Sequence, residues 1–299
     1  MSADATFTSV DLSKLPVPAV IEQIDYETIL SSMLARLREL DPQFTALTES
    51  DPAYKILEVA AWHVMLERQR ANDSCHALML AYAKGSDLDH LGALFGVRRK
   101  LLQPGDPARD IPALYEDDTE FRRRIQLAPE GFSVAGPEGA YVFHALSADA
   151  DVLDASATSP SPGQVRVTVL SRHGTGAPSS QMLQNVRNRL TDDKVRPLTD
   201  QVTVQAAEII QYSVSAVVYT YAGPDSTLVL DEAKRRLDKY IDESRRLGRD
   251  IPRSGIYSVL HTEGVQRVEL TQPAADIAVS RTQAAHCNSI HVLHGGIDE

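Results

Sequence analysis

Apolar residues spaced alternately four and three apart run through two stretches in the first third of the chain, a period that fits a helix and excludes a β-strand. The first stretch lies between Asp25 and Asp41-Pro42. Its members are Tyr26, Leu30, Met33, Leu37 and Leu40. Such heptad spacing is typical of a helix whose narrow apolar seam packs against another helix. Because proline cannot continue a helix, we expect this one to end at Asp41-Pro42.

The second stretch follows Asp51-Pro52 and is longer. Its seam consists of Leu57, Ala61, Val64, Arg68, Ala71, Cys75, Leu78 and Tyr82. It predicts a helix from Ala53 to Lys84, about 48 Å long, with Gly85 as its C-terminal cap. A helix of this length exceeds what a small domain needs, which leaves two interpretations. The two helices form an intramolecular hairpin packed on the rest of the chain, or they join a bundle shared with other chains, in which Arg68 would help to fix register.

The 299 residues are enough for about two domains, and proline marks the boundaries. Pro16 and Pro18 favour an extended start of the chain, and a stretch rich in proline indicates a linker after the helical region. The expected order is an extended segment at 1–24, a helical bundle-forming region at 25–97, a linker at 98–116, a first α+β unit at 117–208 and a second α+β unit at 209–299.

Alternation of helical and strand-like patterns after residue 116 predicts the α+β fold class. A short helix begins at Asp117 or Asp118, and a half-buried strand at 164–170 alternates valine with polar residues. Further helices are expected at 137–147, 180–190, 228–247 and 256–261, and further strands at 152–158, 202–206, 212–221, 265–270 and 285–293. The prediction is therefore a long-helix hairpin followed by two smaller α+β units.

Charge and hydropathy narrow the functional classes. Thirty Lys and Arg against 41 Asp and Glu give a net charge of −11, which disfavours binding to nucleic acid or to an anionic membrane. No apolar run approaches the ~18 residues of a membrane span, and the N-terminus lacks the pattern of a secretory signal. The two cysteines, Cys75 and Cys287, are too far apart in sequence to suggest a disulfide framework. We therefore expect a soluble protein made in a reducing cytoplasm.

Motifs that could carry chemistry are weak. Gly174–Ser179 lies between a predicted strand and a predicted helix, where phosphate-binding loops occur, but it lacks the lysine of a P-loop and the third glycine of a dinucleotide motif. A cytoplasmic nucleotide- or ligand-binding enzyme that uses this loop stays open as the alternative function. His286, Cys287, His291 and His294 offer metal-ligating atoms, but polar residues on an interface strand are the preferred interpretation. Because the sequence contains no catalytic motif, we expect no enzymatic activity, no cofactor and no metal.

Seven stretches without catalytic residues spread over nearly the full length. They are LPVPAVIEQIDYETIL (15–30), GSDLDHLGALFGV (85–97), GFSVAGPEGAY (131–141), SPSPGQVRVTVLSR (159–172), VRPLTDQVTVQ (195–205), RRLGRDIPRSGIYSVLHTEGVQRVEL (245–270) and ADIAVSRTQAA (275–285). Together they resemble the baseplate J-like family of contractile phage tails and R-type pyocins.

The resemblance implies a structural role in a baseplate wedge. Two copies of such a protein join one copy of a smaller wedge protein through N-terminal helices, and their α+β domains connect neighbouring wedges into a six-fold ring around the central spike. The ring meets sheath-initiator, spike or hub, and tail-fibre proteins, holds the extended sheath and transmits the contraction trigger. The resemblance implies that the protein binds neither nucleic acid nor a membrane.

The partner interface that the resemblance implies is the helical seam. Its residues here are Tyr26, Leu30, Met33, Leu37, Leu40, Leu57, Val64, Arg68 and Leu78. The protein would be assembled in the bacterial cytoplasm and end in the tail baseplate of a virion or pyocin released by lysis. A transient tail-assembly scaffold, which leaves before the particle matures, is the remaining alternative.

Overall fold

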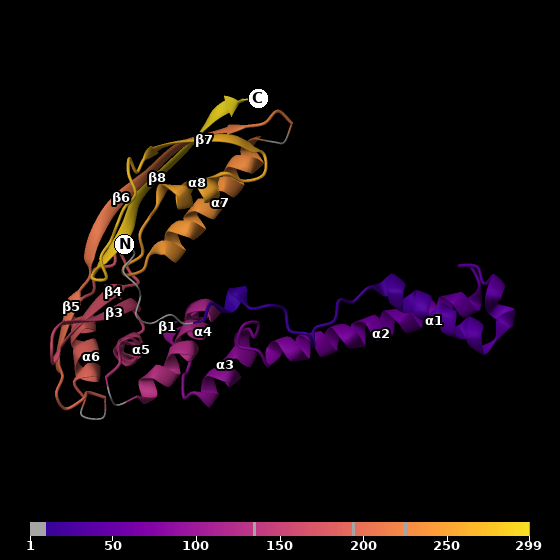
Figure 1. The fold of residues 1–299 in the computed structure, drawn as a ribbon, viewed down its shortest axis with the longest axis horizontal. Helices are drawn as coiled ribbons and strands as arrows, with labels where there is room; N and C mark the ends of the chain where they lie inside the picture. The colour runs from indigo at the N-terminus through magenta and orange to yellow at the C-terminus, as the bar shows by residue number, and fades with distance from the viewer. Residues whose placement is uncertain (1–9, 134–135, 193–194, 224–225, 299) are drawn as a thin grey trace. The chain divides into compact units, whose positions relative to one another are not determined.

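The computed structural model describes residues 10–133, 136–192, 195–223 and 226–298, so residues 1–9 of the expected extended segment lie outside it. The described chain forms two compact units. One unit contains residues 10–99 and Glu116–Ile125, and the other contains Lys100–Tyr115 and the described part of Gln126–Glu299. The first unit is helical and the second contains three small sheets (Figure 1), which confirms the predicted α+β class.

Two helices at the start of the helical unit pack against each other, as their apolar seams predict. Helix α1 spans Tyr26–Leu40, and the Asp25 side chain caps it by accepting a hydrogen bond from the Thr28 N–H. It ends at Asp41-Pro42, as expected, and the short 3-10 helix η2 (Pro42–Ala46) follows. Helix α2 then spans Pro52–Ala77. The buried core that α1 and α2 share consists of Ile29, Leu30, Leu34 and Ala61.

The second helix is shorter than its heptad pattern predicts. Helix α2 ends at Ala77, and the prediction that it reaches Lys84 is wrong. Gly85 does not cap it but is the first residue of a separate helix, α3 (Gly85–Leu94), which the sequence analysis missed. The φ angle of Gly85 is 51°, a value that favours glycine.

A contact from a later helix accounts for this early end. The Arg122 guanidinium donates hydrogen bonds to the main-chain carbonyls of Leu80 and Ala83, both at 2.6 Å. These carbonyls belong to the turn that separates α2 from α3, so Arg122 satisfies acceptors that a continuous helix would have paired internally. The apolar pattern continues past Ala77, but this tertiary contact favours the turn.

Helix α4 (Asp118–Leu127) confirms the short helix expected at Asp117 or Asp118. The Asp117 carboxylate accepts hydrogen bonds from the N–H groups of Thr119 and Glu120 at the start of this helix. Phe121 on α4 is fully buried, and its ring lies so close to Gly92 of α3 that a Cβ atom there would come within 2.6 Å of it. The two helices thus meet where one of them has no side chain.

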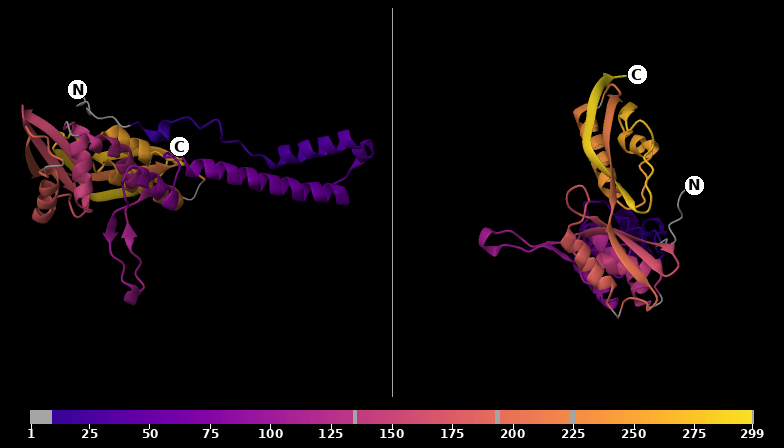
Figure 2. Two further views of the ribbon diagram at one scale, coloured as in Figure 1. Left: turned by 90° about the horizontal axis from the view of Figure 1, so that it is seen from below. Right: turned by 90° about the vertical axis from the view of Figure 1, so that its left-hand side faces the viewer.

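Residues 98–116, expected as a linker, include a two-stranded antiparallel ribbon (Figure 2). Strand β1 (Leu101–Gln103) pairs with β2 (Leu114–Tyr115), and the short 3-10 helix η3 (Pro107–Arg109) lies between them. Pro107 occupies the first turn of η3, where its missing N–H costs no hydrogen bond. Proline-rich composition therefore marks the turn of a ribbon here.

The first three-stranded sheet has the order β3-β4-β5. Its strands are β3 (Val152–Ser161), β4 (Gln164–Ser171) and β5 (Gln201–Ala206); β3 is antiparallel and β5 is parallel to the central β4. Its helices are α5 (Glu138–Ala148), which follows the short 3-10 helix η4 (Ala128–Phe132), and α6 (Ser180–Leu190), which connects β4 to β5. Valines of β4 and leucines of both helices form one core.

The second three-stranded sheet has the order β7-β6-β8, again with one antiparallel and one parallel neighbour of the central strand. Its elements are β6 (Glu208–Thr220), α7 (Ser226–Ser244), α8 (Arg253–Leu260), β7 (Val265–Gln272) and β8 (Gln283–Ile297). Helices α7 and α8 cover one face of this sheet (Figure 1) and share its core. Among the described residues, no helix is both long and apolar enough to cross a lipid bilayer.

Candidate interaction surface

The predicted seam residues divide between the inside and the outside of the α1–α2 pair. Leu30 is 4% exposed and belongs to the shared core. Tyr26, Met33, Leu57 and Val64 are partly buried and pack against this core, and the Tyr26 hydroxyl donates to the Glu58 carbonyl at 3.4 Å. These side chains hold α1 against α2 within one chain, which corresponds to the intramolecular hairpin.

Two of these residues, Met33 and Leu57, also line an open groove along the same two helices, together with the seam residues Leu37 and Leu40. The groove has a volume of about 440 Å³ and contains residues from both α1 and α2. Its lining is Ser32, Met33, Arg36, Leu37, Leu40, Leu57 and Ala60. Leu40 is 68% exposed, so most of its surface is left uncovered by its own chain. The structure thus brings four predicted seam residues, Met33, Leu37, Leu40 and Leu57, to a surface that another molecule can reach.

A second apolar surface follows the opposite face of α2, and the sequence analysis missed it. We call it the outer stripe; its residues are Ile56, Val59, Trp62 and Leu66, each between 41% and 68% exposed. At 100° per residue these positions lie on the side of α2 that faces away from Leu57, Ala61 and Val64. Spacings of three, three and four make the stripe visible in the sequence once the inner seam is assigned to α1.

Two predicted seam residues lie outside both surfaces. Arg68 is exposed rather than buried in the seam, and its guanidinium forms an ion pair with Glu22 at 3.4 Å. Leu78 lies just beyond the end of α2 and is exposed. The sequence pattern placed both on a helix face that α1 does not reach.

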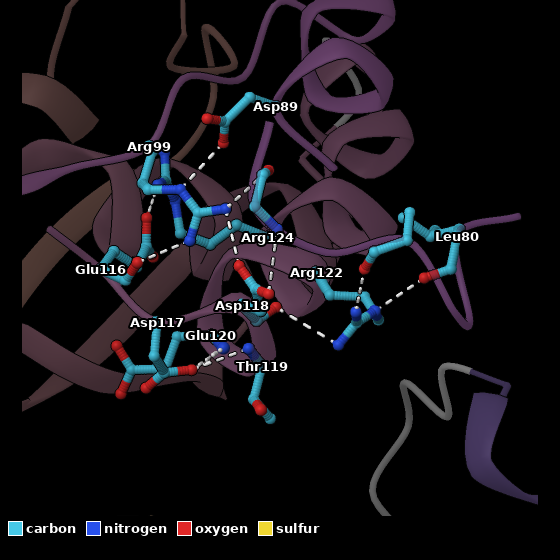
Figure 3. Close-up of polar contacts among 12 residues, drawn as sticks. Leu80, Asp89, Arg99, Glu116, Asp117, Asp118, Thr119, Glu120, Arg122 and Arg124 are labelled. Atoms are coloured by element: carbon cyan, nitrogen blue, oxygen red, sulfur yellow. Dashed lines mark hydrogen bonds and ion pairs between the residues drawn. The ribbon is translucent and has the colours of Figure 1, made fainter. Parts of the chain in front are cut away.

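A polar cluster around Arg99 holds together the part of the helical unit that contains α3 and the start of α4 (Figure 3). The Arg99 guanidinium donates to the carboxylates of Asp89 and Asp118, both at 2.8 Å, and to the Glu116 carbonyl at 2.7 Å. It also lies over the Phe121 ring, 4.7 Å from its centre. Burial acts to lower the pKa of the Arg99 guanidinium. The two carboxylates together have the larger effect, so this pKa is raised.

The first and third arginines of the run Arg122-Arg123-Arg124 also have structural partners. Arg122 binds the turn after α2, as described above. Arg124 donates to the Glu116 carboxylate at 2.6 Å, and both side chains are at least 90% buried. A buried charge is tolerated when it is paired in this way. Arg122 therefore fixes the turn after α2, and Arg124 links α4 to the segment that precedes it.

The loop Gly174–Ser179 has a different environment from a phosphate-binding loop. The Ser179 side chain accepts a hydrogen bond from the Met182 N–H and so caps α6. The Arg245 guanidinium donates to the carbonyl oxygens of Gly174, Ser171 and Arg172. Carbonyl oxygens at the start of this loop and just before it thus bind a cation of the protein itself.

The polar residues of the last strand lie along β8 without converging. His286 and Cys287 are adjacent on β8 and pair with Gln211 and Tyr212 of β6, while His294 meets the Thr220 hydroxyl at 3.1 Å. Within the ranges that the structure describes, no three His, Cys, Asp or Glu side chains are grouped so that they could hold a metal ion.

Comparison with known proteins assigns the chain to a family. Residues 49–106 match the Baseplate J-like N-terminal domain, residues 133–206 match the Baseplate J-like central domain and residues 212–293 match the Baseplate J-like protein C-terminal domain. Baseplate protein J of Escherichia phage P2 is 46% identical to this chain, over 97% of this chain and 99% of that protein.

A solved structure, the six-fold symmetrised baseplate of the anti-feeding prophage, contains a chain with 14% sequence identity and a TM-score of 0.39. The similarity covers 59% of this chain and 44% of that chain, and a TM-score this low does not establish a shared fold. The family matches and the phage P2 relative are sufficient without it. The chain belongs to the Baseplate J-like family and is a structural component of a baseplate.

Proposed function

We propose that this protein is a wedge component of the baseplate of a contractile tail or contractile injection particle, with a structural and non-enzymatic role. In this proposal the α1–α2 pair joins the helices of other wedge chains, and the α+β domains connect wedges into a ring around the central spike. The ring holds the sheath extended until a trigger rearranges it. Membership of the Baseplate J-like family supports this role.

The observation that carries the proposal is the apolar surface of α2 on two opposite faces. One face packs on α1 and borders the open groove, and the other carries the outer stripe. A helix that is apolar on opposite faces is typical of the interior of a bundle, because water disfavours exposed apolar stripes. Helix α1 covers only one of these faces, and we infer that helices of other chains cover the other.

The partners we propose are a second copy of this chain and a smaller wedge protein. Neighbouring wedges and the sheath-initiator, spike or hub, and tail-fibre proteins complete the set. Assembly takes place in the bacterial cytoplasm, and the finished protein resides in the particle released by lysis. A ring of six repeated interfaces makes a modest coupling at each one cooperative over the whole, as a single contraction event requires.

Charge placed on the two apolar surfaces tests the proposal. We expect Leu40→Asp in the groove and Val59→Asp in the outer stripe each to reduce recovery of the full-length chain in sheathed particles by about tenfold. Both side chains are more than half exposed, so the isolated chain should keep its fold. Particles are separated by sedimentation and the chain is quantified by peptide mass spectrometry.

Leu94→Asp on α3 is the matched control, because Leu94 is 78% exposed but lies outside both surfaces. The single tryptophan, Trp62, belongs to the outer stripe, and its fluorescence should shift to the blue when partner helices cover it. Normal particle yield from both charged variants would refute the proposed interface. Leu30→Asp is unsuitable for this test, since Leu30 lies in the core of the α1–α2 pair itself.

A further inference from the structure

A buried asparagine in the C-terminal half of α2 binds the main chain of the N-terminal segment. Asn72 is 7% exposed, although it belongs to a stretch of α2 where most side chains are exposed. The Glu22 N–H donates to its Oδ1 at 3.1 Å, and its Nδ2 donates to the Glu22 carbonyl at 2.9 Å. This two-bond exchange copies the pairing of neighbouring strands in a sheet. Asn72 thus holds one residue of an extended chain at a defined position along the helix.

Apart from Asn72, the N-terminal segment is held mainly at its end, where the partly buried Ile24 packs against the core of the α1–α2 pair. Among residues 10–24, the side chains of Val10, Leu15, Val17 and Val20 are exposed, so they contribute little packing against α2. Pro16 and Pro18 lack the N–H that could pair with a neighbour. The Glu22–Arg68 ion pair is solvent-exposed on both sides, and such pairs contribute little. The segment runs beside α2 (Figure 1) and leads directly into α1.

We propose that Asn72 is a positioning residue that sets the register of the N-terminal segment on α2 and thereby the position of α1 along α2. The two bonds of Asn72 are to main-chain atoms, so they oppose a shift of the segment by one residue whatever side chain stands at residue 22. A shift by two residues could restore these bonds but would remove Ile24 from the core of the α1–α2 pair. A shift by one residue would leave a buried amide without its partners, which is costly. A buried asparagine has the same effect in coiled coils, where it selects one register at the expense of stability.

This role deepens the proposed function, because the groove and the outer stripe are useful to partners only if α1 returns along α2 in one register. Stability alone would favour leucine at position 72, since leucine is the better helix former and needs no hydrogen bond when buried. A positioning role and a purely stabilising role therefore predict different behaviour for Asn72→Leu.

The experiment compares amide hydrogen exchange, thermal stability and particle yield of full-length variants. In Asn72→Leu we expect exchange of the Glu22 amide to accelerate at least about tenfold, because its acceptor is gone. Melting temperature should be unchanged or higher, while recovery in sheathed particles falls about tenfold. Asn72→Ala removes the same two hydrogen bonds without adding bulk, so it covers the case in which leucine does not fit.

Gln69→Leu is the matched control, because it is also an amide-to-leucine change but at an exposed position of α2, where the Gln69 side chain donates a hydrogen bond to Asp73 one turn away. It should leave the exchange of the Glu22 amide and the melting temperature unchanged. Unaltered protection of Glu22 in both Asn72 variants would overturn the proposal, whatever the particles do. Lost protection with normal particle yield would overturn the link to assembly, and failure of the wedge proposal itself would appear separately in Leu40→Asp and Val59→Asp.

Discussion

At the scale of single residues, buried polar side chains determine where this protein tolerates change. Glu116 is 2% exposed and its charge is paired with Arg124. Tyr141 donates a hydrogen bond to Asp200 at 2.5 Å. Burial has the largest effect on the pKa of the Tyr141 hydroxyl and raises it, and the hydrogen bond to Asp200 raises it further. His144 on α5 differs, because its Nδ1 atom is buried without a hydrogen-bond partner. Such a group makes stability depend on pH.

Stability of the intact protein should fall as the pH drops below about 6.5 because of His144. Burial lowers the pKa of His144, the charge of Arg189 lowers it further, and a hydrogen bond with the Gly131 backbone acts in the opposite direction. A histidine with a lowered folded-state pKa is protonated first in the unfolded chain, so its contribution to stability is present above pH 6.5 and is lost as the pH falls below that value. In His144→Gln, whose amide nitrogen can replace Nε2, the melting temperature should depend less on pH. Parallel pH profiles for the two proteins would contradict this assignment.

At the scale of helices and strands, close approach at small residues determines the packing. Helix α3 meets α4 at Gly92, where a Cβ atom would lie 2.6 Å from the Phe121 ring and 2.9 Å from the Val97 carbonyl oxygen. The second of these neighbours is main chain and cannot move aside like a flexible side chain. This contact and the hydrogen bonds of Arg99 fix α3 and the start of α4 relative to each other, in the part of the chain that follows α2.

Gly92→Ala should therefore destabilise the helical unit by about 1–3 kcal/mol, the usual cost of inserting a methyl group into a filled space. Alanine is the better helix former, so propensity alone predicts the opposite sign. Urea denaturation followed by Trp62 fluorescence measures the change, because the single tryptophan lies in this unit. Ala93→Ser, at the neighbouring exposed position, should change stability by less than about 0.5 kcal/mol.

At the scale of the whole molecule, the two three-stranded sheets are joined by contacts between their own elements. Leu247 donates its N–H to the buried Asp154 carboxylate at 3.0 Å, and Arg246 donates to the Leu153 carbonyl at 2.9 Å. A small apolar cluster of Leu170, Ala207 and Ala284 lies at the same junction. The two cores are therefore linked by buried polar and apolar contacts within one compact unit.

A fragment spanning residues 126–299 should fold on its own and unfold in one transition. Both of its cores are built from its own residues, and the junction couples them. Circular dichroism during thermal and urea unfolding, with tyrosine fluorescence as a second probe, tests this expectation. Two separated transitions, or probes that disagree, would show that the junction is too weak to couple the sheets.

The sequence by itself determined the kinds of elements and most of their positions. Helix α1, helix α6 and the valine-alternating strand β4 agree with their patterns within one residue, because local period and capping residues dominate there. Family membership was also evident from motifs distributed along the chain, and the comparisons confirm it.

The tertiary structure alone decided which apolar residues are covered and where the long helix ends. The heptad pattern of α2 is equally compatible with one continuous helix and with a break at Ala77, and Arg122, more than 40 residues away, favours the break. The same pattern identifies an apolar seam without saying which partner covers it. Leu30 is inside the α1–α2 pair and Leu40 is outside because burial depends on the position of the neighbouring helix, which local sequence does not encode.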